Sequence, residues 1–208
     1  MKKAEALAAN VKPWNKGVRV GKKLHLSADQ VTIIEYHLAH EKRYRDLALF
    51  RLAIDSMLRG IDLLQLKSKI AAPGGQAVER ITTGQQKVKG RPVQICLTDR
   101  TRKAVEAWYQ QGGITVWNYL FPGETKGHLS TRQYCNLVKQ WVALAGLNPE
   151  NYGTHSLRRT KAHQIYIASG GNLRAVQLLL GHSSIQNTQE YLGVEEEAAL
   201  DIAAGVTI

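Results

Sequence analysis

The sequence is poor in cysteine and has no long hydrophobic stretch, and both features limit what the protein can be. Its two cysteines among 208 residues, Cys96 and Cys135, show no metal-site spacing and are typical of a reducing cytoplasm. No apolar run approaches the roughly 18 residues of a membrane span, and the N-terminus lacks the apolar region of a signal peptide. Neither a Gly-rich phosphate loop nor an H-E-x-x-H motif occurs, so we expect no nucleotide or metal cofactor.

Acidic residues are also scarce. The chain has 17 Asp and Glu against 28 Lys and Arg, a net charge of +11, which favours a polyanionic partner such as nucleic acid. Residues 1–23 hold seven basic residues and one acidic residue, whereas residues 193–208 hold four acidic residues and no basic one. We therefore expect a flexible basic arm at 1–23, a folded domain at 24–192 and an acidic C-terminal tail or helix at 193–208.

One stretch, residues 154–191, combines four side chains suited to work on a phosphodiester: His155, Arg158, His182 and Tyr191. A guanidinium offers a planar fork of donors to phosphate oxygens and keeps its charge. An imidazole donates hydrogen bonds or moves protons near neutral pH. A tyrosine hydroxyl can attack phosphorus and form a covalent intermediate. Each residue alone is common in a purely structural role, so the prediction depends on their combination.

The spacing predicts three helices in this stretch. The first begins with Thr154 or Ser156 as its N-cap. Asn172 caps the second helix, which Gly181 ends. The third covers roughly Ile185–Tyr191. The second histidine of the pattern therefore lies on a sharp turn between two helices.

This pattern resembles the C-terminal catalytic box of the tyrosine recombinase (phage integrase) family, in which His-x-x-Arg, Leu-Gly-His and the nucleophilic tyrosine follow one another. Here Arg158 and His182 lie 24 positions apart, and His182 and Tyr191 lie nine apart. The resemblance implies a mainly α fold with a small antiparallel β-sheet (α+β), the catalytic-domain fold of that family. Because only 23 residues precede the matching region, the chain resembles short stand-alone members such as the fimbrial-switch invertases.

Residues 57–66 resemble the family's first box, Gly-Leu-Arg-x-x-Glu-Leu-x-x-Leu. Arg59 would be the first catalytic arginine and Asp62 the acid that supports the turn. Met57 stands where the family has glycine, and Asp62 is one methylene shorter than the usual glutamate. Both departures bear on the geometry of this turn.

A basic run between two expected strands, 78–82 and 92–97, lies where the family keeps its catalytic lysine. Lys87 matches that lysine best, and Lys89 is the alternative. The residues alone indicate only a solvated basic turn.

The helix expected at 130–144 begins with a capping box, Ser130 to Gln133, and in the resembled family the corresponding helix enters the major groove of DNA. Arg132 is a candidate base reader because a guanidinium can pair bidentately with guanine, although a solvated arginine fits equally well. Further helices are expected from the Ser27 capping box, over 44–54 and over 99–111. The other candidate DNA contacts are Lys89, Arg91, Arg159 and Arg174.

The resemblance implies a site-specific DNA recombinase of the kind found in mobile elements, acting in the cytoplasm on the nucleoid. Tyr191 would form a 3′-phosphotyrosyl link, Arg59 and Arg158 would hold the phosphate, Lys87 would protonate the leaving oxygen, and the two histidines would assist. Two other functions stay open, a type IB topoisomerase-like nicking enzyme and a catalytically silent DNA-binding accessory protein. The implied partner is double-stranded DNA.

The resemblance also implies an assembly. It predicts a monomer in solution and a homo-tetramer on DNA, with an accessory DNA-bending protein as a further partner and no membrane. The acidic tail at 193–208 would dock either on its own domain or on a neighbouring protomer.

Overall fold

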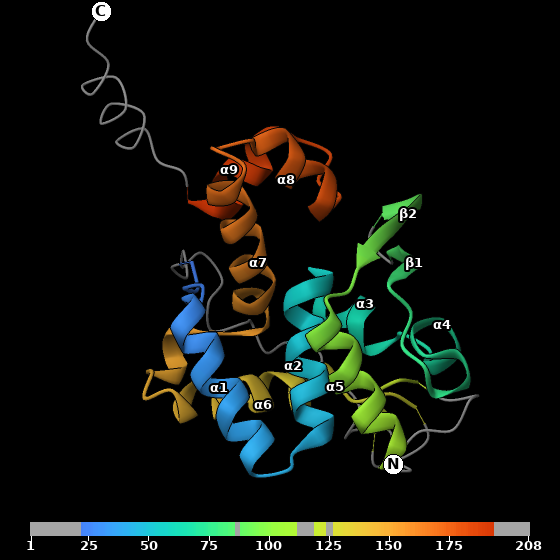
Figure 1. Cartoon of the computed structure of the whole chain (residues 1–208). Helices are drawn as coiled ribbons and strands as arrows, with labels where there is room; N and C mark the ends of the chain where they lie inside the picture. The colour runs from blue at the N-terminus through green and yellow to red at the C-terminus, as the bar shows by residue number, and fades with distance from the viewer. Residues whose placement is uncertain (1–21, 86–87, 112–118, 124–126, 194–208) are drawn as a thin grey trace, which may run out of the picture.

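The computed structural model describes residues 22–85, 88–111, 119–123 and 127–193. Its longer helices in the first part of the chain form the lower body in Figure 1, and the C-terminal helices lie above that body. The helices are α1 (Ala28–His40), α2 (Tyr44–Ser56), α3 (Gly60–Leu64), α4 (Ser68–Ala71), α5 (Asp99–Gln110), α6 (Thr131–Leu144), α7 (Thr154–Ala168), α8 (Leu173–Leu180) and α9 (Ile185–Leu192), with 3-10 turns η2 (Pro73–Gly75) and η3 (Pro149–Asn151).

Both expected capping boxes begin their helices. The Ser27 hydroxyl accepts from the Gln30 amide at the start of α1, and Ser130 and Gln133 form the same reciprocal pair at the start of α6. Such a pair satisfies two amide donors that a helix leaves without intrahelical partners. Helix α7 differs from expectation, because its N-cap is Gly153.

Neither of the two residues predicted as the N-cap of α7, Thr154 and Ser156, occupies that position. Ser156 is instead the third residue of α7, and its hydroxyl accepts from the Gly153 amide at 3.0 Å. A glycine N-cap has no side chain to offer, so only this half of a capping box forms. The predicted catalytic residues His155 and Arg158 are therefore both inside the helix.

The main core lies between α2 and α6. Trp141 and Phe50 pack edge to face with ring centroids 5.6 Å apart, and both are fully buried. The buried side of α6 consists of Tyr134, Val138, Trp141 and Val142. This body provides a rigid support for the elements that carry the predicted catalytic residues.

The small sheet is an antiparallel hairpin of β1 (Arg80–Gln85) and β2 (Val88–Cys96). Ile81 pairs with Ile95, and both side chains are buried against the body. The pairing shifts between Thr83 and Gln85, which is the sign of a β-bulge. The mainly α fold with a small antiparallel sheet is thereby confirmed.

A second, smaller hydrophobic cluster joins the three C-terminal helices to the body. It consists of Met57, Ala162, Val176, Leu180 and Leu192. Four of these residues come from α7, α8 and α9, and Met57 alone comes from the turn between α2 and α3. The turn beside Arg59 is therefore part of the same packed unit as the C-terminal helices.

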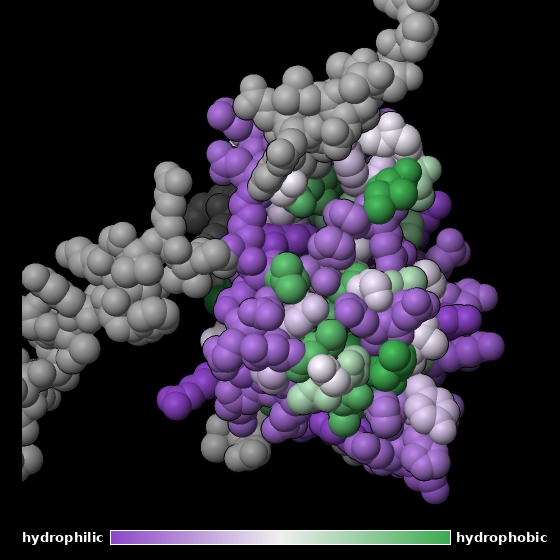
Figure 2. Space-filling model, turned by 90° about the vertical axis from the view of Figure 1, so that its left-hand side faces the viewer, coloured by the Kyte–Doolittle hydropathy of each residue, from purple (hydrophilic) through white to green (hydrophobic). Residues whose placement is uncertain are grey.

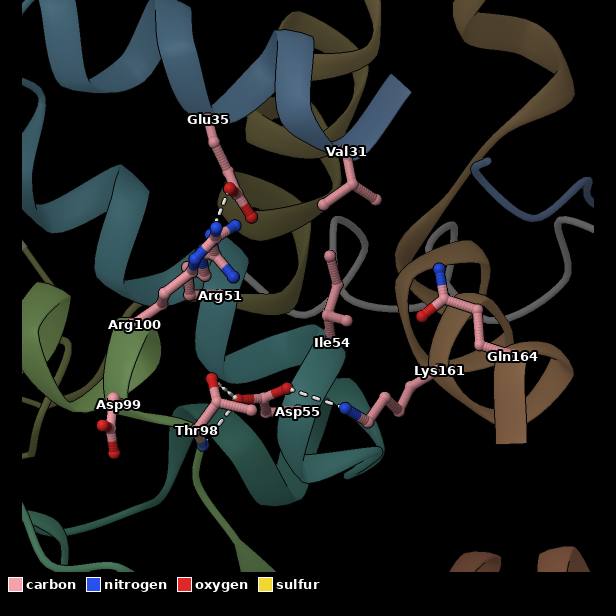
Figure 3. Close-up of a pocket in the computed structure, with 10 residues that line it drawn as sticks. All are labelled: Val31, Glu35, Arg51, Ile54, Asp55, Thr98, Asp99, Arg100, Lys161 and Gln164. Atoms are coloured by element: carbon pink, nitrogen blue, oxygen red, sulfur yellow. Dashed lines mark hydrogen bonds and ion pairs between the residues drawn. The ribbon is translucent and has the colours of Figure 1, made fainter. Parts of the chain in front are cut away.

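An ion pair also ties α7 to the body. Lys161 Nζ lies 3.3 Å from Asp55 Oδ1 at the end of α2, and Asp55 also accepts from Thr98 (Figure 3). These residues border a cavity of about 370 Å³ that also includes Glu35, paired with Arg51. None of the described catalytic candidates lines this cavity, and the Lys161–Asp55 pair beside it joins α7 to α2.

The surface is largely hydrophilic on the face in Figure 2, with smaller hydrophobic areas between the charged side chains. Within the described part of the chain, no helix is long and apolar enough to cross a membrane. The basic arm up to residue 21, Lys87 and the tail from residue 194 lie outside the described residues.

Candidate active site

Arg158 lies near the start of α7 and is 2 % exposed. Its Nη2 donates to the Leu180 carbonyl at 2.6 Å, whereas Nε meets no hydrogen-bond partner among the described residues. Burial and the neighbouring charge of Arg59 lower the pKa of Arg158 to about 10. A guanidinium remains charged at neutral pH even so, and a buried cation with a spare donor is costly unless an anion binds it.

Arg59 belongs to the same site although it lies about a hundred positions earlier in the chain. It is the N-cap of α3, in the extended conformation (φ −64°, ψ 146°). Its charge lowers the pKa values of both Arg158 and His182, so the three side chains lie close together. Asp62 is buried and its carboxylate opposes part of this effect on Arg158.

The turn that presents Arg59 depends on Met57. This residue ends α2 in the left-handed conformation (φ 49°, ψ 24°), which usually favours glycine. The methionine therefore adopts the backbone conformation that the family's glycine provides, and its side chain is buried in the second cluster. The departure from the family pattern leaves the turn intact.

His182 lies directly after Gly181, which ends α8 in the left-handed region (φ 65°). Two hydrogen bonds hold its backbone to Gln177, from the His182 amide at 3.1 Å and from Gln177 Nε2 at 3.2 Å. Its ring Nδ1 lies 3.1 Å from the Thr188 hydroxyl. Burial, Arg158 and Arg59 lower the pKa of His182 to about 4, so the ring is neutral at physiological pH.

Tyr191 lies near the end of α9 with its ring among these groups. Its centroid is 5.4 Å from that of His182 and 4.9 Å from the Arg159 Cζ atom. The hydroxyl donates to the His155 backbone carbonyl at 3.2 Å. Burial raises the pKa of Tyr191, and the charges of Arg158, Arg159 and Arg59 oppose that rise.

Four of the predicted residues, Arg59, Arg158, His182 and Tyr191, thus come together from four parts of the chain, and His155, which is exposed, joins them through its backbone carbonyl. Among the described residues the net charge here is positive, because Arg59 and Arg158 oppose the single negative charge of Asp62. An anionic phosphate fits this excess and the spare Arg158 donor. A phenol beside such a phosphate is placed for nucleophilic attack.

A comparison with protein families agrees with this geometry. The sequence model described as the Phage integrase family matches residues 25–198. The chain belongs to this family. Among its relatives in the phage integrase family, tyrosine recombinase XerC of Erythrobacter litoralis (strain HTCC2594) is 34% identical over 151 residues, which is 73% of this chain and 47% of that protein.

Tyrosine recombinase XerD of Rhizobium meliloti (strain 1021) is 32% identical over 157 residues, 74% of this chain and 49% of that protein. The chain thus spans about half the length of these curated relatives. The fold resembles the crystal structure of XerA recombinase with a TM-score of 0.70 at 20% identity, covering 97% of this chain and 70% of that one. The structure of XerH bound to a palindromic difH substrate gives a TM-score of 0.68 at 21% identity. The match covers 88% of this chain and 53% of the XerH chain.

The candidate catalytic lysines of this integrase-family chain lie in or beside the hairpin, where few side chains are described. Lys87 lies outside the described residues, and only the backbone of Lys89 and Arg91 is described, in β2. Strand β2 contacts α8, so the hairpin lies on the same side of the body as the C-terminal helices (Figure 1). The choice between the two lysines therefore stays open.

The other DNA-binding candidates differ in exposure. Arg132 is exposed in the first turn of α6, and Arg174 is exposed on α8, where its Nη1 donates to Gln177 at 2.8 Å. Arg159 is buried, at 9 % exposure, and faces Tyr191 instead of solvent. The sequence interpretation did not identify Thr188, whose only advance signal is its position six residues after His182.

Proposed function

We propose that the chain is the catalytic domain of a site-specific DNA recombinase that cuts and rejoins DNA through a 3′-phosphotyrosyl intermediate. The observation that carries this proposal is buried Arg158, a cation with a spare donor, beside the hydroxyl-bearing ring of Tyr191. Family membership supports the same chemistry, and so does the likeness in fold to XerH, which is known in a post-cleavage complex with its difH substrate.

In the proposed first step, the Tyr191 oxygen attacks the scissile phosphorus and the 5′-oxygen of the next nucleotide leaves. Arg59 and Arg158 hold the non-bridging oxygens and stabilise the charge of the transition state. Lys87, or Lys89 in its place, protonates the leaving 5′-oxygen, and His155 accepts the phenol proton. A 5′-hydroxyl of a second duplex then attacks the phosphotyrosyl link, so the bond energy is kept and no ATP is required.

The low pKa of His182 defines its role in this proposal. A neutral ring has one N–H, and it donates to phosphate from Nε2 only if Nδ1 accepts from the Thr188 hydroxyl. The Thr188 hydroxyl lies 3.1 Å from Nδ1 and 3.4 Å from the Ser184 carbonyl, and in this proposal its single proton points to Nδ1. His182 would then act as a hydrogen-bond donor and not as an acid.

The tyrosine must also move before it can attack. Its hydroxyl donates to the His155 carbonyl in the described conformation, so that bond has to break when the phosphate arrives. We propose that assembly of a homo-tetramer on DNA, and where required a DNA-bending protein, favours this change at the nucleoid.

A nicked-duplex trap tests the proposed function. Duplexes of random sequence with a nick placed to release the cleaved 5′ fragment are mixed with the full chain, and covalently attached strands are sequenced. Recovered strands should share a site, and a plasmid with two such sites should yield recombinants. Relaxed plasmid without recombinants would instead indicate a topoisomerase-like enzyme, and bound DNA without covalent strands would indicate an accessory DNA-binding protein.

A further inference from the structure

The segment just before α1 lies along α7, next to the proposed active site. We call residues 22–26 the strap. The Lys23 carbonyl accepts from Arg159 Nη1, and the Leu26 amide donates to the Thr160 hydroxyl at 2.9 Å. The His25 ring stacks on His163 with centroids 3.9 Å apart. The strap therefore contacts about one turn of α7, beginning at the residue after Arg158.

Arg159 lies between the strap and the tyrosine. Its guanidinium bonds the Lys23 carbonyl, and its Cζ atom is 4.9 Å from the centroid of the Tyr191 ring. A cation at this distance over an aromatic face is attracted to the ring, and more strongly when water is excluded. Arg159 is 9 % exposed, so this contact is largely dry.

Three observations support a role for Arg159 in holding the Tyr191 ring. Within the described part of the chain, the Tyr191 hydroxyl makes one hydrogen bond, to the His155 carbonyl, and this bond has to break before attack. Contact with Arg159 acts on the ring face, so it can persist while the hydroxyl turns. The Lys23 carbonyl of the strap accepts from Nη1 of the guanidinium, and a planar guanidinium held at one edge keeps its orientation.

We propose that Arg159 is a positioning residue for Tyr191 and that the strap holds Arg159 in place. This inference rests on the proposed function, since it gives the tyrosine its role as nucleophile. It also revises the interpretation of Arg159 as a phosphate contact. The segment that leads into the domain would thereby influence the reactivity of the tyrosine through a single side chain.

The two roles of Arg159 predict different kinetics. A positioning residue affects the rate of covalent attachment when DNA is saturating, whereas a phosphate contact affects the affinity and its salt dependence. A positioning cation also affects the pH profile, because its charge stabilises the phenolate. The other groups that face Tyr191 are Arg59, Arg158, His182 and the carbonyl of His155, and those around the strap are His25 and His163.

The test uses the full chain and a nicked duplex recovered by the trap described above. Arg159→Gln should slow single-turnover attachment at saturating DNA by at least about tenfold, with affinity changed by less than about threefold. Its rate should also rise at higher pH than that of the unaltered protein. Arg159→Lys should recover part of the rate, since it keeps the charge but not the planar group.

Two further variants complete the design. Arg102→Gln removes one positive charge on α5, where it pairs with Asp99, and should leave the rate unchanged. His25→Ala removes the strap's stacking contact and should slow attachment less than Arg159→Gln does. Adding it to Arg159→Gln should have no further effect, because both changes act through the same contact.

The outcomes separate the possibilities. An unchanged rate at saturating DNA with weaker binding and a smaller salt slope would make Arg159 a DNA contact and overturn the inference. If Arg159→Gln does not fold, a normal rate in both Arg159→Lys and His25→Ala would overturn it equally. If the unaltered protein forms no covalent complex, the proposed function itself fails and this inference falls with it.

Discussion

At the scale of single residues, the site is organised by a buried charge. Arg158 is almost fully buried, and its Nη2 donates to the Leu180 carbonyl. Such a group destabilises the folded chain until an anion arrives. Burial and this charge together lower the pKa of the neighbouring His182, and the same charge opposes the effect of burial on the pKa of Tyr191. The properties of these three side chains therefore depend on one another.

The geometry of the Arg158 guanidinium should matter as much as its charge. We expect Arg158→Lys to lower the single-turnover rate of covalent attachment by at least about 100-fold, because an ammonium cannot make the bidentate fork. The rate is measured at saturating DNA, with Arg102→Gln as the control for loss of an arginine. Near-normal attachment by Arg158→Lys would mean that Arg158 is only structural.

His182 makes the stability of the protein depend on pH. Its pKa is about 4 in the folded chain, below the ordinary 6.5, so between these values the unfolded chain binds a proton that the folded chain does not. The stability that comes from the neutral ring is complete above about pH 6.5 and is lost as pH falls towards 4. We expect the melting temperature of His182→Gln to fall less than that of the unaltered protein between about pH 7 and about pH 5.

The control for this measurement is His40→Gln, a change on the exposed end of α1. The melting temperature of His40→Gln should change with pH by the same amount as that of the unaltered protein. Equal losses in the His182→Gln variant and the unaltered protein would show that His182 takes up its proton at the ordinary pH in the folded state.

At the scale of elements, the turn between α2 and α3 links the two hydrophobic clusters. Met57 carries a backbone conformation that costs an L-residue about 1–2 kcal/mol, and its buried side chain contributes about 1.5–3 kcal/mol. The cost and the contribution are similar in size. The methionine is therefore tolerated where a glycine would satisfy the backbone alone.

This balance predicts an unusual order of stabilities. Met57→Ala should lower the free energy of unfolding by about 2–3 kcal/mol, because it loses packing and keeps the strained conformation. Met57→Gly loses the same packing but relieves the strain, so it should be destabilised by only about 1 kcal/mol. Leu52, inside α2, is the control position: there Leu52→Gly should be less stable than Leu52→Ala, because glycine is unfavourable inside a helix. Urea unfolding measures all four, and the same order at both positions would contradict this account.

Much of this architecture could be predicted from local sequence. Capping boxes at Ser27 and Ser130, and the glycine that ends α8, act through neighbouring residues, so their signals are visible in the sequence. The N-cap of α7 was predicted wrongly because two hydroxyl residues follow a glycine there. The position of Arg159 depends on the strap, more than a hundred residues away in the sequence. No local pattern carries such a tertiary contact.

At the scale of the whole molecule, the positive charge and the acidic tail suggest contact between protomers. The tail from residue 193 has four acidic residues and follows the tyrosine directly, whereas the body is basic. Opposite charges favour docking on a neighbour, and a head-to-tail contact can close into a ring. Packing of the tail on its own domain is the alternative.

Truncation after Leu192 separates these possibilities. Exchange between protomers predicts that single-site binding remains largely intact while cooperative binding to a two-site duplex, and recombination, decrease. Gel-shift titration measures both, and circular dichroism confirms that the truncated chain is folded. Unchanged cooperativity in the folded truncated protein would rule out the exchange model.

The proposed reaction depends on Tyr191 being the nucleophile, and one measurement tests that assignment directly. Covalent complex from the nicked-duplex trap is digested with trypsin, and the DNA-linked peptide is sequenced by mass spectrometry. We expect the C-terminal peptide that begins at Ala175, modified at Tyr191, and no complex from Tyr191→Phe, which should still bind DNA. Attachment through another residue, with Tyr166 the next to test, or a normal complex from Tyr191→Phe would contradict the account.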